Sequence, residues 1–291
     1  FVSAAVLKGN QFEITARKIP LHQKESILQR IHDISSYGYP NYFDDQRFGS
    51  IMKSDEILAE RVLRKHYKGA LKLYITTIGP GDKKAEKQRK RKIEELWGDW
   101  HAIAPLCKTK AERDIIKILL EGDSKSQLVK AINVIPKEEL SMHFSAYQSF
   151  LWNLSLEQVL LKHIKKPFKI KGKIMDYAFY KTLDEGALKK LKNTQIPTAA
   201  YKIPGNAEIS KIVRDILSER GLKPSDFNLT KIRKSFFKSN FRPAIVFPEW
   251  NDDKAIFEED DIYPGFLKLK LKFTLPSGSF ATMLIKGLDV T

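Results

Sequence analysis

The sequence predicts a fold of the α+β class, with extended segments at both ends of the chain and a helical middle. The clearest sign is Leu267–Phe273, where apolar residues alternate strictly with lysines, as in a strand with one buried face. Residues 1–19 repeat this two-residue pattern. From residue 54 onward, charged segments instead carry apolar residues at the three- and four-residue spacing of helices.

The first fifty residues predict extended chain followed by a helix. Phe1–Ile19 is interrupted at Lys8-Gly-Asn10, so it forms either two paired strands or one strand with a bulge at Gly9. Gln23–Ser36 carries one apolar stripe and stops at Tyr37-Gly38. Extended chain followed by one helix is therefore expected here.

The middle of the chain predicts a series of helices. Ser54 is a candidate N-cap for a helix after residue 56, and Thr109-Lys-Ala-Glu112 has the pattern of a capping box. Pro136 suits the first turn of a long helix over about 137–163. Lys83–Lys92 holds seven basic residues and one acid, and it predicts a helix face.

Beyond Pro167 the pattern changes to short strands and further helices. Extended pieces are expected at 169–175, 177–182, 199–203 and 241–247, and Asn206–Arg220 reads as a helix ended by Gly221. After the strand at 267–273, a short helix is expected to run through Leu288.

The composition limits the classes of function. The chain has 291 residues and a formal charge of +16, which attracts polyanions, of which nucleic acid is the usual one; the alternative is a basic surface that binds nothing. Cys107 is the single cysteine, and the six histidines lack the spacing of a metal site. We expect no metal and no nucleotide cofactor, because P-loop and dinucleotide-binding motifs are absent.

No apolar run has the length needed to span a membrane, and the pattern of a signal peptide is missing. Together with the lone cysteine, this predicts a protein of the cytoplasm that does not contact a membrane. The first residue is Phe, and we expect the chain to be a fragment of a longer protein.

The stretch Tyr39–Ser50 is unusual, because four aromatic residues stand among an Arg, a Gln and two carboxylates. Such a loop suits a planar, hydrogen-bonding ligand such as a nucleic-acid base; equally, it suits an aromatic hinge that packs two domains together. Asp44 and Asp45 are adjacent and point in opposite directions in an extended chain, so they are poor candidates for a catalytic dyad. Pairing with Arg47 or capping the next helix explains them better.

Two basic runs are candidates for phosphate contacts, namely Lys83–Lys92 and Lys162–Lys173, with a solvated helix or loop face as the alternative for each. The lysines of the 267–273 strand are expected to form its solvent-exposed face. From the residues alone, the chain is a basic, mixed α/β protein suited to nucleic acid, and no reaction follows.

Three separated segments resemble motifs of the TruD family of tRNA pseudouridine synthases. They are Leu7-Lys-Gly-Asn10-Gln-Phe12, Pro40-Asn-Tyr-Phe-Asp-Asp-Gln-Arg-Phe-Gly49 and Leu275-Pro-Ser-Gly-Ser-Phe280-Ala-Thr282. Ala146-Tyr-Gln-Ser-Phe-Leu-Trp-Asn153 resembles a helix motif of the same family. Their order and spacing agree over essentially the whole chain.

The resemblance implies a pseudouridine synthase core with a mainly antiparallel sheet, interrupted by a large α/β insertion domain. The core would comprise residues 1–52 and 263–291, and the insertion domain residues 53–262. The implied activity is isomerisation of uridine 13 of tRNA, by a monomer that uses neither metal nor organic cofactor.

The resemblance also implies roles for individual residues. Phe12 and Phe280 are the expected aromatic contacts of the base pocket, and Asn10 is the expected polar group beside the nucleophile. Tyr42, Gln46 and Arg47 are expected in the pocket wall, with loop packing as the alternative.

The chain departs from the family pattern in two places. The nucleophilic Asp stands in a Gly-x-Lys-Asp-Lys-type motif upstream of the first segment, and no Asp of this chain occupies it. Lys286-Gly287 replaces the usual Arg-Glu. We therefore expect no catalytic residue in this chain and no activity from it alone. The competing hypotheses are a non-catalytic RNA-binding protein and, less favoured, a DNA-binding module.

Overall fold

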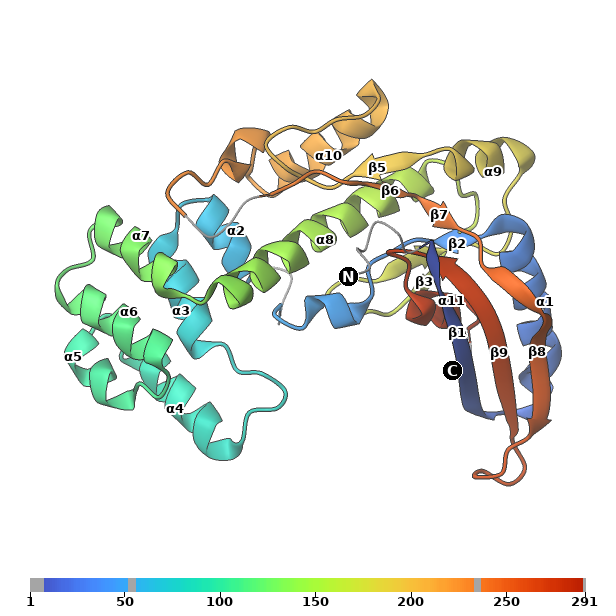
Figure 1. Ribbon diagram of the computed structural model, residues 1–291, viewed down its shortest axis with the longest axis horizontal. Coiled ribbons are helices and arrows are strands. Elements are labelled where there is room, and N and C mark those ends of the chain that lie inside the picture. The colour runs from blue at the N-terminus through green and yellow to red at the C-terminus, as the bar shows by residue number, and fades with distance from the viewer. Residues whose placement is uncertain (1–7, 52–55, 233–236, 290–291) are drawn as a thin grey trace. The chain divides into compact units, whose positions relative to one another are not determined.

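The computed structural model describes residues 8–51, 56–232 and 237–289, as helices α1–α11 and strands β1–β9 (Figure 1). Within these residues, the strands form a three-stranded sheet in the order β1-β9-β8 and three two-stranded pairs, β2-β7, β3-β4 and β5-β6. Helices and small antiparallel sheets occur together, so the predicted α+β class is confirmed.

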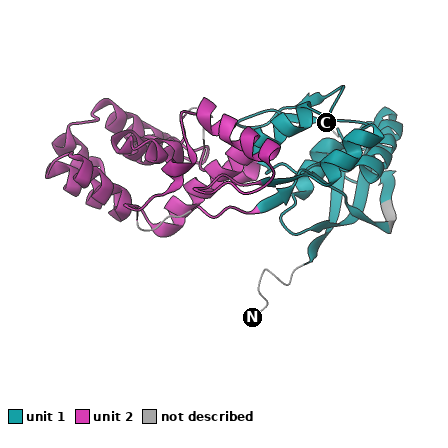
Figure 2. Cartoon of the chain, turned by 90° about the horizontal axis from the view of Figure 1, so that it is seen from above, with its two compact units in different colours: residues 1–44, 153–196, 241–291 teal, residues 45–152, 197–240 magenta. Residues whose placement is uncertain are grey.

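The chain divides into two compact units (Figure 2). Unit 1 contains residues 1–44, 153–196 and 241–291, and unit 2 contains residues 45–152 and 197–240. Compared with the expected domains, residues 153–196 and 241–262 lie in unit 1 with the core, and residues 45–51 lie in unit 2. Strand pairing ties residues 241–262 to unit 1, since β7 pairs with β2 and β8 pairs with β9.

The three-stranded sheet of unit 1 joins the two ends of the described chain. It consists of β1 (Gly9–Ile19), β8 (Glu249–Glu259) and β9 (Leu267–Pro276), paired antiparallel. In β9 the residues alternate between buried and half-buried, as predicted. The lysines form the solvent-facing side of the strand. Lys268 donates a hydrogen bond to Asp261 at 2.6 Å, and Lys270 donates one to Glu258 at 2.9 Å.

Gly9 begins β1 where the backbones of β1 and β9 approach closely. A Cβ atom built on Gly9 would lie 2.5 Å from the carbonyl oxygen of Leu275, which only glycine avoids. Gly9 pairs in register with Pro276, so the bulge considered at Gly9 is not found there; the register shifts between Ala16 and Ile19.

Unit 1 also contains helices and short strands outside this sheet. They are α1 (Lys24–Tyr37), β2 (Tyr39–Pro40), β3 (Phe168–Ile170), β4 (Tyr177–Phe179), α9 (Glu185–Lys192), β7 (Ile245–Val246) and α11 (Ala281–Gly287). Buried Arg30 of α1 donates to the carbonyl oxygen of Gly287 at 2.8 Å and to that of Tyr180 at 3.3 Å. This guanidinium therefore ties α1 to the end of α11.

Unit 2 is mainly helical. Its helices are α2 (Leu58–Leu63), α3 (Tyr67–Thr76), α4 (Lys84–Glu95), α5 (Trp100–Ile103), α6 (Lys110–Leu120), α7 (Lys125–Val134) and α10 (Ala207–Glu219). Helix α8 (Lys137–Leu161) begins in unit 2 and continues into unit 1 after residue 152. The predicted capping box of Thr109 and Glu112 is present, and Asn206 caps α10.

Several predicted strands differ from the structure. Residues 199–203 form no strand; the nearby strand is β5 (Gln195–Pro197), which pairs with β6 (Phe241–Pro243). Strand β8 was not predicted, because acidic residues interrupt its apolar alternation and only pairing with β9 holds it extended. The expected strand residues Val2, Ala4 and Val6, and the expected N-cap Ser54, lie outside the described residues.

Replacing Gly9 by Ala should destabilise the protein, because the new methyl group forces the backbones of β1 and β9 apart. We expect the free energy of unfolding to fall by about 1–3 kcal/mol. Urea denaturation of Gly9→Ala measures this. Gly81→Ala is the matched control, since no atom lies within 4 Å of a Cβ there, and an equal loss in both variants would contradict the close-approach explanation.

Candidate functional site

The first and third sequence motifs are neighbours in the sheet of unit 1. Asn10 on β1 is the register partner of Leu275 on β9, and Phe12 is the partner of Phe273. The Leu275–Thr282 motif thus begins beside Asn10, although more than 260 positions separate them in the sequence. Asn10 and Phe12 stand two residues apart and face the same side of the sheet, Asn10 exposed and Phe12 half-buried.

Aromatic rings cross the sheet at this end. The Phe12 ring stacks on the Phe273 ring with 5.6 Å between centroids, and the Trp250 ring meets Phe273 edge-on at 5.5 Å. Phe273 is fully buried, so the partly exposed Phe12 has a rigid support beneath it. A ring held in this way can receive a planar base by stacking without losing much side-chain freedom.

The second motif reaches the third through residues 39–44. The Tyr39 hydroxyl donates to the carbonyl oxygen of Phe280 at 3.5 Å, and the Phe43 ring meets the Phe280 ring edge-on with 5.7 Å between centroids. Phe280 is half-exposed and directly precedes helix α11. Parts of all three motifs, up to Asp44 in the second, are therefore linked within unit 1.

Arg242, the middle residue of β6, completes this cluster. Its guanidinium carbon lies 3.7 Å from the centroid of the Phe43 ring, within cation–π range. The same group donates to the carbonyl oxygens of Gly278 and Asn41, each at 2.9 Å. Gly278 has a φ of +84°, a conformation that glycine adopts at little cost. Arg242 thus fixes the turn before Phe280 against the loop that carries Phe43.

Asn153 of α8 holds the Phe43 backbone. Its side-chain carbonyl oxygen accepts from the Phe43 amide at 2.9 Å, and its amide nitrogen donates to the Phe43 carbonyl oxygen at 2.8 Å. Because Asn153 is fully buried, both polar groups of Phe43 are satisfied without water. This explains why an Asn ends the Ala146–Asn153 motif.

Asp44 and Lys286 form an ion pair beneath the cluster. The Lys286 Nζ donates to the Asp44 Oδ1 at 2.7 Å, and the Asp44 side chain is 5% exposed. Arg47 was one expected partner of the two carboxylates, and for Asp44 the structure gives Lys286 on α11. The pair joins the end of the 39–44 loop to the helix that follows Phe280, and it gives Lys286, which departs from the family pattern, a structural role.

Tyr42 lies inside the core of unit 1. Its side chain is fully buried and packs on the Tyr177 ring at 5.1 Å and the Phe179 ring at 6.3 Å. Burial raises the pKa of the Tyr42 phenol well above its ordinary value. The alternation of the chain turns Tyr42 inward and leaves Phe43 facing Phe280.

Gln46 and Arg47 belong to unit 2, whereas Asn10, Phe12 and Phe280 belong to unit 1. Both are exposed on the short 3₁₀ segment Asp45–Phe48, and the Arg47 Nε donates to the Ser149 Oγ at 3.3 Å. They line a cavity of about 390 Å³ together with Ser50, Glu138, Ser141 and Met142 among others. Phe48, between these residues and α2, is buried against Phe150.

Sequence reasoning missed Arg242 and Phe43. Phe43 stood inside the aromatic stretch, and its alternation with Tyr42 could have marked it as the opposite face. Arg242 belongs to no motif, and only its position over the Phe43 ring identifies it. Among the described residues, no group of three or more His, Cys, Asp or Glu is placed to hold a metal ion, and no helix could cross a bilayer.

Comparison with known proteins agrees with this arrangement of motifs. The family model of tRNA pseudouridine synthase D (TruD) matches residues 1–288. The chain therefore belongs to the TruD family of tRNA pseudouridine synthases.

Relatives and a solved structure support the assignment. The tRNA pseudouridine synthase D of Aquifex aeolicus is 31% identical over 97% of this chain and 69% of its own length. A Methanococcus maripaludis relative, designated probable tRNA pseudouridine synthase D 1, is 32% identical over 96% of this chain and 72% of its own length. The TruD crystal structure from Methanosarcina mazei shares the fold, with a TM-score of 0.72 at 23% identity, and covers 98% of this chain and 70% of that one.

Breaking the Asp44–Lys286 pair should destabilise the protein, because removal of one partner leaves a charge with little access to water. We expect Lys286→Met to lower the free energy of unfolding by about 2–3 kcal/mol, less than for a fully buried pair since Lys286 is partly exposed. In the double variant Asp44→Asn/Lys286→Met, the loss should be smaller than the sum of the single losses. Urea denaturation of the four proteins gives the coupling energy, and strict additivity would refute the pair.

Proposed function

We propose that the protein isomerises uridine 13 of tRNA to pseudouridine. Family membership supports the reaction class, and the convergence of three motifs around Phe12 and Phe280 supports a base-binding site in unit 1. The convergence carries the proposal, because sheet register brings together residues that no local structure would.

The aromatic cluster fits what this reaction requires. A uridine inside a folded RNA must leave its stack before its glycosidic bond can be reached. Phe12 and Phe280 would stack on the extruded base, and exposed Asn10 would hydrogen-bond to it or to the nucleophile. Phe43, Arg242 and Asn153 do not need to touch the base, since they hold Phe280 and its turn in place.

The nucleophile in this proposal is an Asp carboxylate in a Gly-x-Lys-Asp-Lys-type motif, which these 291 residues do not contain. The remaining parts of the proposal are a tRNA partner, a cytoplasmic location, a monomeric state and chemistry without metal or organic cofactor. The second candidate is a non-catalytic RNA-binding protein that retains the base pocket.

A transcript assay separates the two candidates. The 291 residues alone should leave a tRNA transcript unchanged, whereas the protein with the Asp motif ahead of them should produce pseudouridine at position 13. Mass spectrometry of nuclease digests measures the product, and a transcript with cytidine at position 13 is the control. Absence of product with the Asp motif present would favour the RNA-binding alternative, and product at another position only would contradict the site.

Truncating Phe280 should impair the reaction, because the base loses a stacking surface. We expect Phe280→Ala in the protein that carries the Asp motif to lower the rate about 5- to 150-fold, the range for loss of one base–aromatic contact. Tyr263→Ala is the control, since Tyr263 is an aromatic residue that is 41% exposed in the turn between β8 and β9. This turn lies at one end of the sheet, and Gly9 lies at the other end. Equal rates in both variants would remove Phe280 from the site.

A further inference from the structure

The basic run of α4 separates into two groups of side chains. Arg89, Lys90 and Lys92 are engaged by carboxylates of unit 2. Arg89 donates to both Glu86 and Glu112, Lys90 donates to Asp82 at 2.8 Å, and Lys92 lies 3.4 Å from Glu95. These contacts fix α4 to its neighbours. They also neutralise the positive charges of Arg89, Lys90 and Lys92 within the protein.

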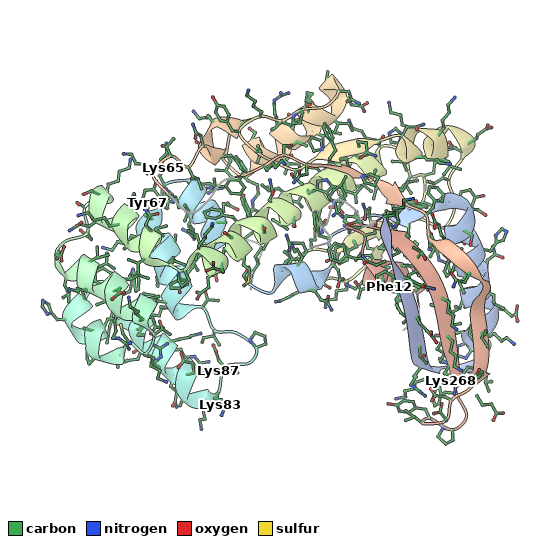
Figure 3. The ribbon with its side chains drawn as sticks, in the orientation of Figure 1. Phe12, Lys65, Tyr67, Lys83, Lys87 and Lys268 are labelled. Carbon is green, nitrogen blue, oxygen red and sulfur yellow. The ribbon has the colours of Figure 1, made fainter. Side chains whose placement is uncertain are left out.

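The other four cations of the run are different. Lys83, Lys84, Lys87 and Arg91 have no carboxylate within ion-pair distance in the described part of the chain, and all four are exposed or half-exposed. Lys83, Lys87 and Arg91 are spaced four residues apart, so they follow one another along one side of the helix. Figure 3 labels Lys83, the residue that precedes α4, and Lys87 near the start of the helix.

The nearby acids cannot neutralise this stripe without leaving other partners. Glu86 accepts from Arg89 and lies 2.9 Å from Lys108, and these two cations hold the pKa of its carboxyl at about 2. Glu94 pairs with Lys72 at 3.2 Å. The stripe Lys83–Lys87–Arg91 therefore keeps its charge.

Such a stripe opposes helix stability. Like charges four residues apart repel, and cations in the first turn oppose the helix dipole. An amphipathic helix needs only polar residues on its solvent face, so three stacked cations are more than the fold requires. A polyanion laid along this side of α4 would remove the repulsion and release its own counterions.

The other basic run is a weaker candidate. In residues 162–173, Lys165 pairs with Asp184 at 3.0 Å and Lys169 with Glu157 at 3.7 Å. Its positive charge is thus partly neutralised inside unit 1, whereas the α4 stripe stands uncompensated in unit 2.

We infer that the Lys83–Lys87–Arg91 stripe of α4 is a phosphate-binding surface for the tRNA backbone. This inference rests on the proposed function, and it assigns the electrostatic part of tRNA binding to unit 2, while the base is received in unit 1. Contacts of this kind add affinity without reading the RNA sequence. Lysine and arginine here bind the charged phosphates and do not contact the bases.

The test compares binding of an unmodified tRNA transcript to the 291-residue chain and to Lys83→Gln/Lys87→Gln/Arg91→Gln over a range of salt concentrations. The triple variant should bind about tenfold or more weakly near physiological salt, and the slope of log affinity against log salt should fall by about 2–3. Its melting temperature should stay the same or rise, since the repulsion is gone.

The control is Lys125→Gln/Lys130→Gln/Lys137→Gln, which removes the same charge from exposed lysines on α7 and α8 of unit 2. The inference would be overturned if the control variant weakened binding equally or if the α4 variant bound unchanged. It would also be overturned if duplex DNA bound equally tightly or if the parent chain did not bind the transcript. None of these depends on turnover. Failure of the α4 surface therefore remains distinguishable from failure of the proposed reaction, which the pseudouridine assay reports.

Discussion

The antiparallel pairing of β1 with β9 is the constraint on which the site depends. It requires glycine at position 9, because the Leu275 carbonyl oxygen occupies the space of a side chain, and it places Asn10 beside Leu275 and Phe12 on Phe273. The turn after β9 then begins at a fixed point, so Phe280 and α11 follow from the same register. A slip of one residue would move Phe12 to the other face of the sheet and dissolve the aromatic cluster.

A second set of contacts holds the 39–44 loop against that turn. Neutral hydrogen bonds from Asn153 satisfy the Phe43 backbone. The Arg242 guanidinium lies over the Phe43 ring and donates to two carbonyl oxygens. The Asp44–Lys286 pair joins the end of the loop to α11. Each contact joins segments far apart in the sequence. The cluster is therefore preorganised by tertiary structure, as the proposed stacking of an extruded base requires.

The two units distribute charge and aromatic surface differently. In unit 1 the lysines of β9 are matched by Glu258 and Asp261, and the distinctive groups are rings with hydrogen-bonded support. In unit 2, α4 keeps a stripe of cations that its own acids leave uncompensated. This separation is consistent with an enzyme family whose substrate offers one base to a pocket and a long phosphate backbone to a surface.

Much of the local structure could be read from the sequence. The strict alternation of Leu267–Phe273, the capping box at Thr109 and the helix end at Gly221 depend on neighbouring residues, and each formed as predicted. The site roles of Asn10, Phe12 and Phe280 stay predictions from the motifs. Tertiary structure alone decided that β8 is a strand, that residues 153–196 and 241–262 belong with unit 1, that Tyr42 turns inward and that Lys286 reaches Asp44. These outcomes depend on which distant segment supplies the hydrogen bond, the ring or the counter-charge, and no local pattern encodes that partner.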